Sequence, residues 1–209
     1  MFRLYDDMSS GNGYKVRLLL TLLGIPFDYV ALDIDRAETR TPEFLRKNPN
    51  GRIPLLEIAP GDYLAESNAI LFYLAEGTQF MPQEKRARGA ALQWMFFEQY
   101  SHEPNIATVR YWITHKVLTP EREAQLPTKR KLGYAALDVM EGELKKRAFY
   151  AGEQMSIADI ALYAYTHVAG EGGFDLSNYS AINAWLARIA ATPRYIPITF
   201  RPPSRPQAA

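Results

Sequence analysis

Two apolar runs with a helical pattern between them open the chain and restrict its fold more than any other feature. Phe2–Tyr5 and Phe27–Leu32 predict strands, and Tyr14–Leu23 is apolar on almost every side, as expected of a helix buried against a sheet. Gly24 and then Pro26 end that helix. Strands joined through a helix by short connections must be parallel, with a right-handed crossover. The chain therefore begins with a βαβ unit.

Two more helices and a hairpin complete this first pattern. A proline at the first helical position predicts a helix over residues 42–47. The runs Ile53–Ile58 and Tyr63–Ala65 are separated by a turn sequence and predict a hairpin. Ser67 is predicted to cap a helix over Asn68–Glu76. Residues 1–78 thus form an α/β domain of order βαβαββα.

The pattern changes after residue 77, where helical periodicity replaces strands. The clearest stripe consists of Ile182, Trp185, Leu186 and Ile189. We expect an all-helical domain over 85–209, a linker over 79–84 and a loosely ordered tail over 201–209, which holds three prolines. The predicted helices cover 85–115, 120–147, 156–169 and 179–191.

Charge and residue usage exclude several classes of function. Lys and Arg number 24 against 23 Asp and Glu, so no excess charge favours nucleic acid or an anionic membrane. The absence of cysteine excludes disulfides, iron–sulfur clusters and a protein thiol nucleophile. Three widely spaced histidines predict no metal site. With neither a signal pattern nor a membrane-length apolar run, a cytoplasmic protein is expected.

Four short motifs, at their spacing, give the whole chain a family resemblance. They are Ser10-Gly11-Asn12-Gly13-Tyr14-Lys15-Val16, Asn48-Pro49-Asn50-Gly51-Arg52-Ile53-Pro54, Glu66-Ser67-Asn68-Ala69-Ile70 and Ser156-Ile157-Ala158-Asp159-Ile160. The chain resembles the soluble bacterial glutathione transferases of the serine/asparagine, Nu-like type. The resemblance implies a thioredoxin-like domain followed by the helical domain, a homodimer, and detoxification chemistry with glutathione as cosubstrate.

The first motif is the expected position of the glutathione sulfur. A helix N-terminus favours an anion, and a free thiol with a pKa near 8.5 must lose its proton to become nucleophilic. The resemblance assigns this activation to Ser10, with Asn12 as the alternative or additional donor. In the competing interpretation, Ser10 or Asn12 only caps the helix. Tyr5, at the end of the first strand, is interpreted as a packing residue.

The second and third motifs are expected to hold the rest of glutathione. The resemblance implies a cis Ile53-Pro54 bond that presents the Ile53 backbone to the cysteinyl part, and Arg52 near the glycyl carboxylate. It also implies that Ser67 binds the γ-glutamyl carboxylate while Glu66 faces the ammonium. The alternatives are an ordinary trans proline, a solvated arginine at position 52 and a plain helix cap.

The helical domain is expected to supply the second substrate's site and a structural motif. Tyr100, His102, Glu103 and Arg110 are the polar or aromatic candidates for contact with a small electrophile. The Ser156-x-x-Asp159 spacing predicts an N-terminal capping box.

Four functions remain open at this point. The first is a glutathione transferase, and the second is a glutathione-dependent disulfide or peroxide reductase, which without cysteine would need two glutathione molecules. The third is an isomerase of maleylacetoacetate-like substrates, against which Gly11 and Lys15 count. The fourth is a non-catalytic interaction module, disfavoured because Ser10, Pro54 and Ser67 are retained.

Overall fold

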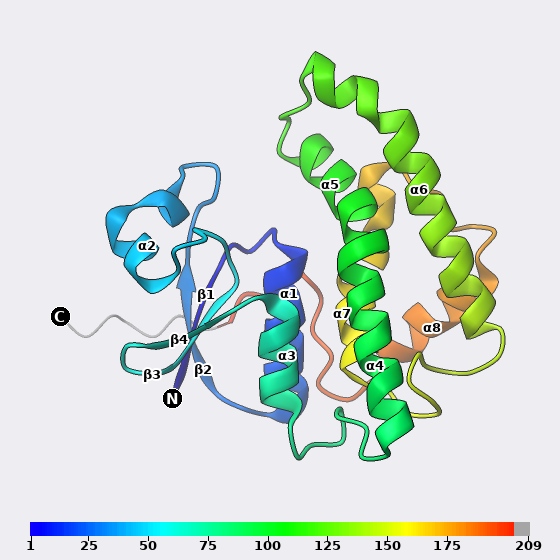
Figure 1. Ribbon diagram of the computed structural model, residues 1–209, viewed down its shortest axis with the longest axis horizontal. Coiled ribbons are helices and arrows are strands. Elements are labelled where there is room, and N and C mark those ends of the chain that lie inside the picture. The colour runs from blue at the N-terminus through cyan, green and yellow to red at the C-terminus, as the bar shows by residue number, and fades with distance from the viewer. Residues whose placement is uncertain (203–209) are drawn as a thin grey trace. The chain divides into compact units, whose positions relative to one another are not determined.

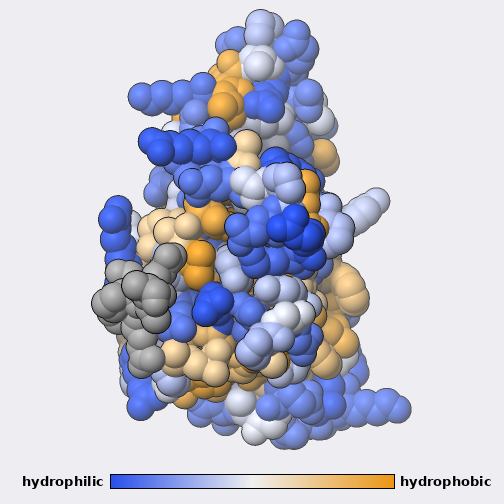
Figure 2. All heavy atoms as spheres, turned by 90° about the vertical axis from the view of Figure 1, so that its left-hand side faces the viewer, coloured by the Kyte–Doolittle hydropathy of each residue, from blue (hydrophilic) through white to orange (hydrophobic). Residues whose placement is uncertain are grey.

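The chain divides into two units, which are described separately. The computed structural model describes residues 1–202. Its first unit holds Met1–Glu76 and the segment from Pro193 on, and the second unit holds Gly77–Thr192. Within residues 1–202 no helix is long and apolar enough to cross a membrane. On the face drawn in Figure 2, hydrophobic residues lie in separate patches among hydrophilic ones.

A four-stranded mixed sheet forms the centre of the first unit (Figure 1). The strands are β1 (Phe2–Asp6), β2 (Phe27–Ala31), β3 (Leu55–Ala59) and β4 (Asp62–Ala65), in the order β2-β1-β3-β4. β1 is parallel to β2 and antiparallel to β3, and β3 pairs with β4 as a hairpin. The predicted βαβ unit and hairpin are confirmed.

Three α-helices accompany the sheet: α1 (Gly11–Leu23), α2 (Pro42–Lys47) and α3 (Ser67–Ala75). In Figure 1, α1 and α3 lie side by side on one side of the sheet and α2 lies on the other. α1 begins at Gly11, three residues before the start predicted at Tyr14, because Ser10 occupies the N-cap position. The predicted cap of α3 is wrong: Glu66 occupies the N-cap position and Ser67 is the first helical residue.

Successive side chains of a strand point to opposite faces of the sheet, so neighbouring residues are buried against different helices. Leu4 pairs with Leu56 and Tyr5 with Leu55 across β1 and β3, and all four are buried. Tyr5 and Leu55 form a cluster with Phe44 of α2. The Tyr5 hydroxyl donates to the Glu57 carboxylate over 3.1 Å. Tyr5 is therefore a packing residue, as interpreted from the sequence.

The C-terminal segment differs from the expected domain boundaries, because it belongs to the first unit and not to the helical one. Two buried side chains of α1 hold it. The Tyr14 hydroxyl donates to the Ile196 carbonyl over 2.7 Å, and Arg17 Nη1 donates to the Ile198 carbonyl over 2.9 Å. Most of the tail predicted to be loosely ordered, residues 203–209, lies outside the described residues.

The second unit is helical, and its residues 77–192, all described, form no strand beyond an isolated bridge between Phe149 and Gly152. The predicted helix over 85–115 is interrupted by a π-helical turn. Pro104 follows this turn and has no N–H for the preceding carbonyls, which explains the break. The elements are α4 (Lys85–Phe97), the π-helical turn (Glu98–His102), α5 (Glu103–Thr114), α6 (Pro120–Leu144), α7 (Ile157–Thr166), a 3₁₀ turn (Ala169–Gly172) and α8 (Ser180–Ala190).

The capping box at the start of α7 is present as predicted. The Asp159 carboxylate accepts hydrogen bonds from the Ser156 backbone N–H and hydroxyl, over 2.8 and 2.9 Å. It also accepts from the Tyr150 backbone N–H and from Trp185 Nε1. Asp159 thus joins α7, the preceding loop and α8 in one buried network.

Candidate functional site

Ser10 lies at the N-cap of α1, directly after the loop that follows β1. Its backbone is extended, and its hydroxyl oxygen accepts a hydrogen bond from the Gly13 N–H over 3.1 Å. A serine hydroxyl has two acceptor lone pairs and one proton. Capping uses only a lone pair, so Ser10 can cap the helix and still donate its proton to an anion.

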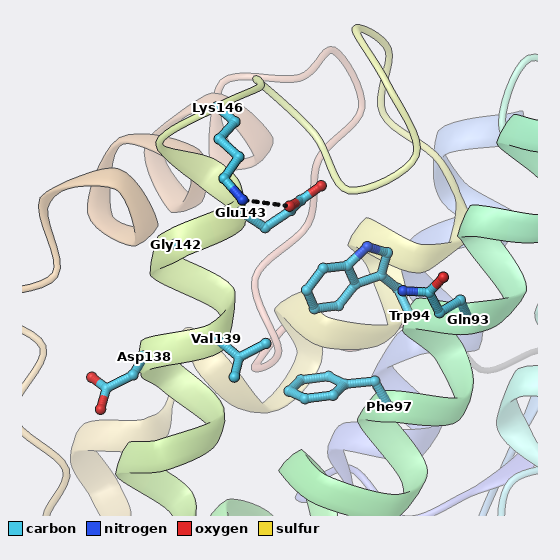
Figure 3. A pocket seen from close by; sticks show the side chains of 8 residues that line it. All are labelled: Gln93, Trp94, Phe97, Asp138, Val139, Gly142, Glu143 and Lys146. Carbon is cyan, nitrogen blue, oxygen red and sulfur yellow. Dashed lines mark ion pairs between the residues drawn. The ribbon is translucent and has the colours of Figure 1, made fainter.

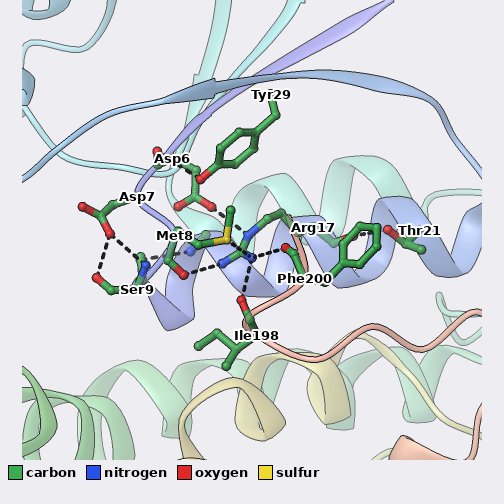
Figure 4. Close-up of polar contacts among 11 residues, drawn as sticks. Asp6, Asp7, Met8, Ser9, Arg17, Thr21, Tyr29, Ile198 and Phe200 are labelled. Atoms are coloured by element: carbon green, nitrogen blue, oxygen red, sulfur yellow. Dashed lines mark hydrogen bonds and ion pairs between the residues drawn. The ribbon is translucent and has the colours of Figure 1, made fainter. Parts of the chain in front are cut away.

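Hydrogen bonds of Asp7 and Arg17 fix the conformation of the loop that precedes Ser10. Asp7 Oδ1 accepts from the Ser9 N–H and hydroxyl over 2.8 and 2.7 Å, and Asp7 Oδ2 accepts from the Ile34 N–H over 3.2 Å. Arg17 Nη2 donates to the Met8 carbonyl over 3.0 Å. Figure 4 shows Arg17 reaching both this loop and the C-terminal carbonyls. The position of Ser10 therefore depends on contacts distant in sequence.

A buried aspartate lies against the first turn of α1. Asp6 has no exposed surface, and its Oδ2 lies 2.9 Å from Arg17 Nε (Figure 4). Burial raises the pKa of the Asp6 carboxyl to about 7, against the opposing effect of the Arg17 charge. A Cβ on Gly13 would lie 1.5 Å from Asp6 Oδ1, so this contact requires glycine. The sequence analysis gave Asp6 no role.

Glu66 has an unusual backbone at the start of α3. Its φ is +68° and its ψ 113°, its side chain is exposed, and it makes no side-chain cap bond. Such a conformation costs a non-glycine residue about 1–3 kcal/mol and is concentrated at functional sites. The exposed carboxylate next to a helix N-terminus gives the predicted ammonium contact a physical basis.

Three side chains from α1 and α3 meet beside Glu66. The Ser67 hydroxyl, almost completely buried, donates to Asn12 Oδ1 over 3.1 Å and accepts from Lys15 Nζ over 3.3 Å. The predicted sulfur donor Asn12 and the predicted carboxylate ligand Ser67 are therefore hydrogen-bonded neighbours. Lys15 was not among the predicted site residues. The available signal was a lysine in a mostly apolar stretch from Tyr14 to Leu23, in which Arg17 and Thr21 are the other polar residues.

The segment before β3 contains the cis peptide bond that the sequence analysis predicted. The Ile53-Pro54 peptide bond is cis. The Ile53 side chain packs against the cluster of Tyr5, Phe44 and Leu55. Arg52 is exposed, and its carbonyl accepts from Asn48 Nδ2 over 2.8 Å.

The four second-substrate candidates differ in their exposure. Tyr100 projects from the π-helical turn with 88% of its surface exposed. Glu103 is half-buried and accepts from Gln99 Nε2. His102 is fully buried, with Nε2 2.9 Å from Thr166 Oγ1, and offers no surface to a ligand. Arg110 is buried and donates from Nε to Glu171 over 2.7 Å.

A cavity of about 410 Å³ lies between α4 and α6 in the second unit (Figure 3). Trp94, Phe97 and Val139 give it an apolar side, and a Glu143–Lys146 ion pair of 3.8 Å lies at its edge. None of the four second-substrate candidates lines it. Among residues 1–202, no cluster of three or more His, Asp or Glu side chains is placed to hold a metal ion.

Comparison with known families gives two matches that together cover most of the chain. Residues 1–76 match the family model for the glutathione S-transferase N-terminal domain. Residues 94–193 match the model for the glutathione S-transferase C-terminal domain. The order of the two models agrees with the α/β unit followed by the helical one.

Individual proteins show the same similarity. A crystal structure of a glutathione S-transferase from Pseudomonas fluorescens Pf-5 is 53% identical, with a TM-score of 0.92 over 94% of this chain and 98% of that one. The Escherichia coli disulfide-bond oxidoreductase YfcG is 31% identical over 87% of each chain. A Burkholderia graminis glutathione transferase with two glutathione molecules bound per subunit is 29% identical, with a TM-score of 0.80 over 92% of this chain and 85% of that one.

Proposed function

The chain belongs to the glutathione S-transferase family, and on that premise we propose that it binds glutathione and activates the thiol for attack on a small electrophile. The observation that supports this most directly is the 3.1 Å hydrogen bond between Ser67 and Asn12. It joins the N-terminus of α3, proposed for the γ-glutamyl end, to the first turn of α1, proposed for the sulfur. Relatives crystallised with glutathione support the same ligand.

Each proposed contact has a chemical reason. Ser67 and the α3 N-terminus take the γ-glutamyl carboxylate, and Glu66 takes the ammonium. The Ile53 backbone next to the cis bond pairs with the cysteinyl part, and Arg52 faces the glycyl carboxylate. At the sulfur, the Ser10 hydroxyl, the Asn12 amide and the α1 N-terminus stabilise the thiolate. Lowering the thiol pKa by about two units requires about 2.7 kcal/mol, within reach of one donor and the helix dipole.

Titration with glutathione, followed through the ultraviolet absorbance of the thiolate across pH, tests the proposal. A saturable thiolate signal at neutral pH is expected, and its absence would contradict thiol activation. Ser67→Ala and Glu66→Ala should weaken glutathione binding severalfold with unchanged circular dichroism. Ser10→Ala should raise the bound-thiol pKa more than it weakens binding. If only Asn12→Ala raises it, Asn12 is the principal donor.

The similarity to YfcG favours glutathione-dependent disulfide reduction as the second candidate. The chain has no cysteine, so one glutathione thiolate would attack the substrate disulfide and expel one substrate thiolate. A second glutathione thiolate would attack the resulting mixed disulfide, which gives oxidised glutathione and expels the other substrate thiolate. Turnover of bis(2-hydroxyethyl) disulfide, compared with conjugation of 1-chloro-2,4-dinitrobenzene, separates the two activities. The activity with the higher kcat/KM identifies the main chemistry.

We also propose a cytoplasmic homodimer, with Tyr100 as the retained second-substrate contact and α3 and α4 at the subunit interface. Each of these helices exposes an aromatic side chain, Tyr73 at 44% and Phe96 at 70%. Sedimentation should give a dimer mass, and Phe96→Glu should shift it towards the monomer. A wild-type monomer would contradict this assembly.

A further inference from the structure

The buried Arg17 guanidinium contacts two segments that are far apart in the sequence (Figure 4). Nη2 donates to the Met8 carbonyl over 3.0 Å, in the loop before Ser10. Nη1 donates to the carbonyls of Ile198 and Phe200 over 2.9 and 3.3 Å, and to Met8 Sδ over 3.0 Å. One side chain of α1 therefore links the C-terminal segment to the loop that leads to the proposed sulfur donor.

The C-terminal segment presents these carbonyls from a defined conformation. The Phe200 N–H donates to the Pro197 carbonyl over 2.9 Å, which closes a tight turn. Ile196 is 6% exposed, and its carbonyl accepts from the Tyr14 hydroxyl over 2.7 Å. The segment is thus anchored on α1 at two points, the Tyr14 hydroxyl and the Arg17 guanidinium.

The geometry of a guanidinium makes the contacts of Arg17 interdependent. Its N–H groups lie in one plane at fixed angles, so the group turns as a unit. Nε lies 2.9 Å from Asp6 Oδ2, and this buried carboxylate compensates the charge. Since Asp6 and the C-terminal carbonyls fix Nε and Nη1, the direction of Nη2 is fixed too. A shift of the C-terminal segment therefore turns the guanidinium and displaces the Met8 carbonyl.

The Met8 carbonyl lies within the turn that positions Ser10. The Ser10 N–H donates to the Asp7 carbonyl over 2.9 Å, so residues 7–10 move together. A hydrogen bond weakens steeply when its distance or angle departs from the optimum. A misplacement of about 1 Å at a reacting group can cost about a hundredfold in rate. The stabilisation that Ser10 gives to a bound thiolate therefore depends on the position of Met8.

We propose that the C-terminal turn acts on thiol activation through Arg17, which positions the Ser10 hydroxyl against the glutathione sulfur. This inference rests on the proposed function. Arg17 is fully buried and offers no surface to a ligand, so it is a positioning residue that acts through Met8. In the competing explanation, Arg17 only compensates the charge of Asp6. Any cation at position 17 would then suffice, and the C-terminal segment would have no effect on the sulfur.

The first test loosens the C-terminal segment without changing the loop before Ser10. Tyr14→Phe keeps the ring and removes the hydroxyl that holds Ile196. The pKa of bound glutathione, read from the thiolate absorbance at saturation, should rise by about half a unit, the effect of one weakened hydrogen bond. The Kd of S-methylglutathione, which has no thiol, should stay unchanged, because the loop acts on the sulfur.

Thr21→Val is the matched control for Tyr14→Phe. It also removes a hydroxyl of α1 that donates to a backbone carbonyl, here the carbonyl of Arg17 over 2.9 Å, but it touches neither the loop nor the C-terminal segment. The two variants should lower the denaturation midpoint to a similar extent. Only Tyr14→Phe should raise the thiol pKa, which separates positioning from a general loss of stability.

Double variants test the route through Arg17 and Ser10. In a Ser10→Ala or an Arg17→Lys background, Tyr14→Phe should cause no further rise in the thiol pKa, because the transmitting contact is already lost. Arg17→Lys keeps a cation beside Asp6 but loses the planar group, and it should raise the thiol pKa by about half a unit or more. A wild-type thiol pKa in Arg17→Lys would reduce Arg17 to a counter-charge for Asp6.

Hydrogen exchange of the free protein gives a measurement that requires no ligand. The Ser9 and Ser10 N–H groups both donate to Asp7, so their protection reports the order of the loop. Tyr14→Phe should increase both exchange rates severalfold, and Thr21→Val should not.

The outcomes separate this inference from the proposed function. If the wild type forms a thiolate with bound glutathione, but Tyr14→Phe keeps either the wild-type thiol pKa or the wild-type exchange rates, the inference is overturned and the transferase proposal stands. A rise in thiol pKa that persists in the Ser10→Ala background bypasses Ser10 and also overturns the inference. A wild type that forms no thiolate with glutathione overturns both.

Discussion

Two buried aspartates, one in each unit, show how differently a carboxylate can be accommodated. Asp159 accepts hydrogen bonds from Ser156, Tyr150 and Trp185, all neutral groups. Asp6 is paired instead with the Arg17 guanidinium, 2.9 Å away. Burial raises the pKa of Asp159 to about 6 and that of Asp6 to about 7, with these partners acting in the opposite direction. Several fixed N–H and O–H dipoles thus oppose the effect of burial at Asp159, and one buried cation does so at Asp6.

Removal of the Asp159 carboxylate should have the largest effect. Asp159→Ala leaves the buried donors of Ser156, Tyr150 and Trp185 without an acceptor, and we expect a loss of about 4 kcal/mol in the free energy of unfolding. Urea denaturation followed by circular dichroism measures it. The control is Asp175→Ala, at an exposed residue whose Oδ1 accepts from the Ser177 N–H. A loss below about 1 kcal/mol in Asp159→Ala would contradict the central role of this network.

The Asp6 site is tested through its neighbouring glycine. Gly13→Ala introduces a Cβ 1.5 Å from the Asp6 carboxylate, and we expect a loss of about 2–3 kcal/mol. Gly89→Ala is the matched control, because a Cβ there meets no atom within 4 Å in helix α4. Alanine at position 89 should stabilise the protein by about 0.5–1 kcal/mol. Equal effects in the two variants would show that the Asp6 contact does not constrain residue 13.

The pH dependence of stability separates the two aspartates. Each has a folded-state pKa above its ordinary value of 3.8, so each stabilises the folded protein below about pH 4 and loses that contribution as the pH rises. The stabilising contribution of the protonated carboxyl is fully lost near pH 6 for Asp159 and near pH 7 for Asp6. The free energy of unfolding of the wild type should therefore fall relative to Asp6→Asn up to about pH 7, by at most about 1.4 kcal/mol per pH unit.

Denaturation midpoints at intervals between pH 4 and 8 give this difference, and the histidines cancel because both proteins contain them. Asp159→Asn should show its own difference only up to about pH 6. If the midpoints of the wild type and of Asp6→Asn change in parallel with pH, Asp6 keeps an ordinary pKa.

The smallest expected effect concerns the cap of α1. Ser10→Ala should lower the free energy of unfolding by about 1 kcal/mol, because the Gly13 N–H loses its acceptor. Ser10→Asp should recover the cap, since aspartate is also a preferred N-cap residue. It should not recover the bound thiolate, because a second negative charge opposes it. Equal thiolate formation in Ser10→Asp and the wild type would contradict a donor role for Ser10.

The same contrast explains which features were predictable from the sequence. Asp159 follows Ser156 by three residues, and helix geometry alone brings such a pair together. Asp6 and Arg17 lie on different elements, so their contact depends on how β1 and α1 pack. Likewise, Ser10, Asn12 and Ser67 were predicted by motif, whereas Lys15 was missed because its partner Ser67 is 52 positions away.

The sequence by itself determined the order of elements in the first unit and the capping box, and the resemblance that its motifs carry implied the family and the cis Ile53-Pro54 bond. These features depend on local spacing and on motifs a few residues long. Only the tertiary structure decided that the C-terminal segment returns to the first unit, that His102 is buried, and that one hydroxyl joins Lys15 to Asn12. The physical reason is that a buried hydrogen bond requires two partners at the right distance and direction, and residues far apart in the chain acquire that geometry only through packing.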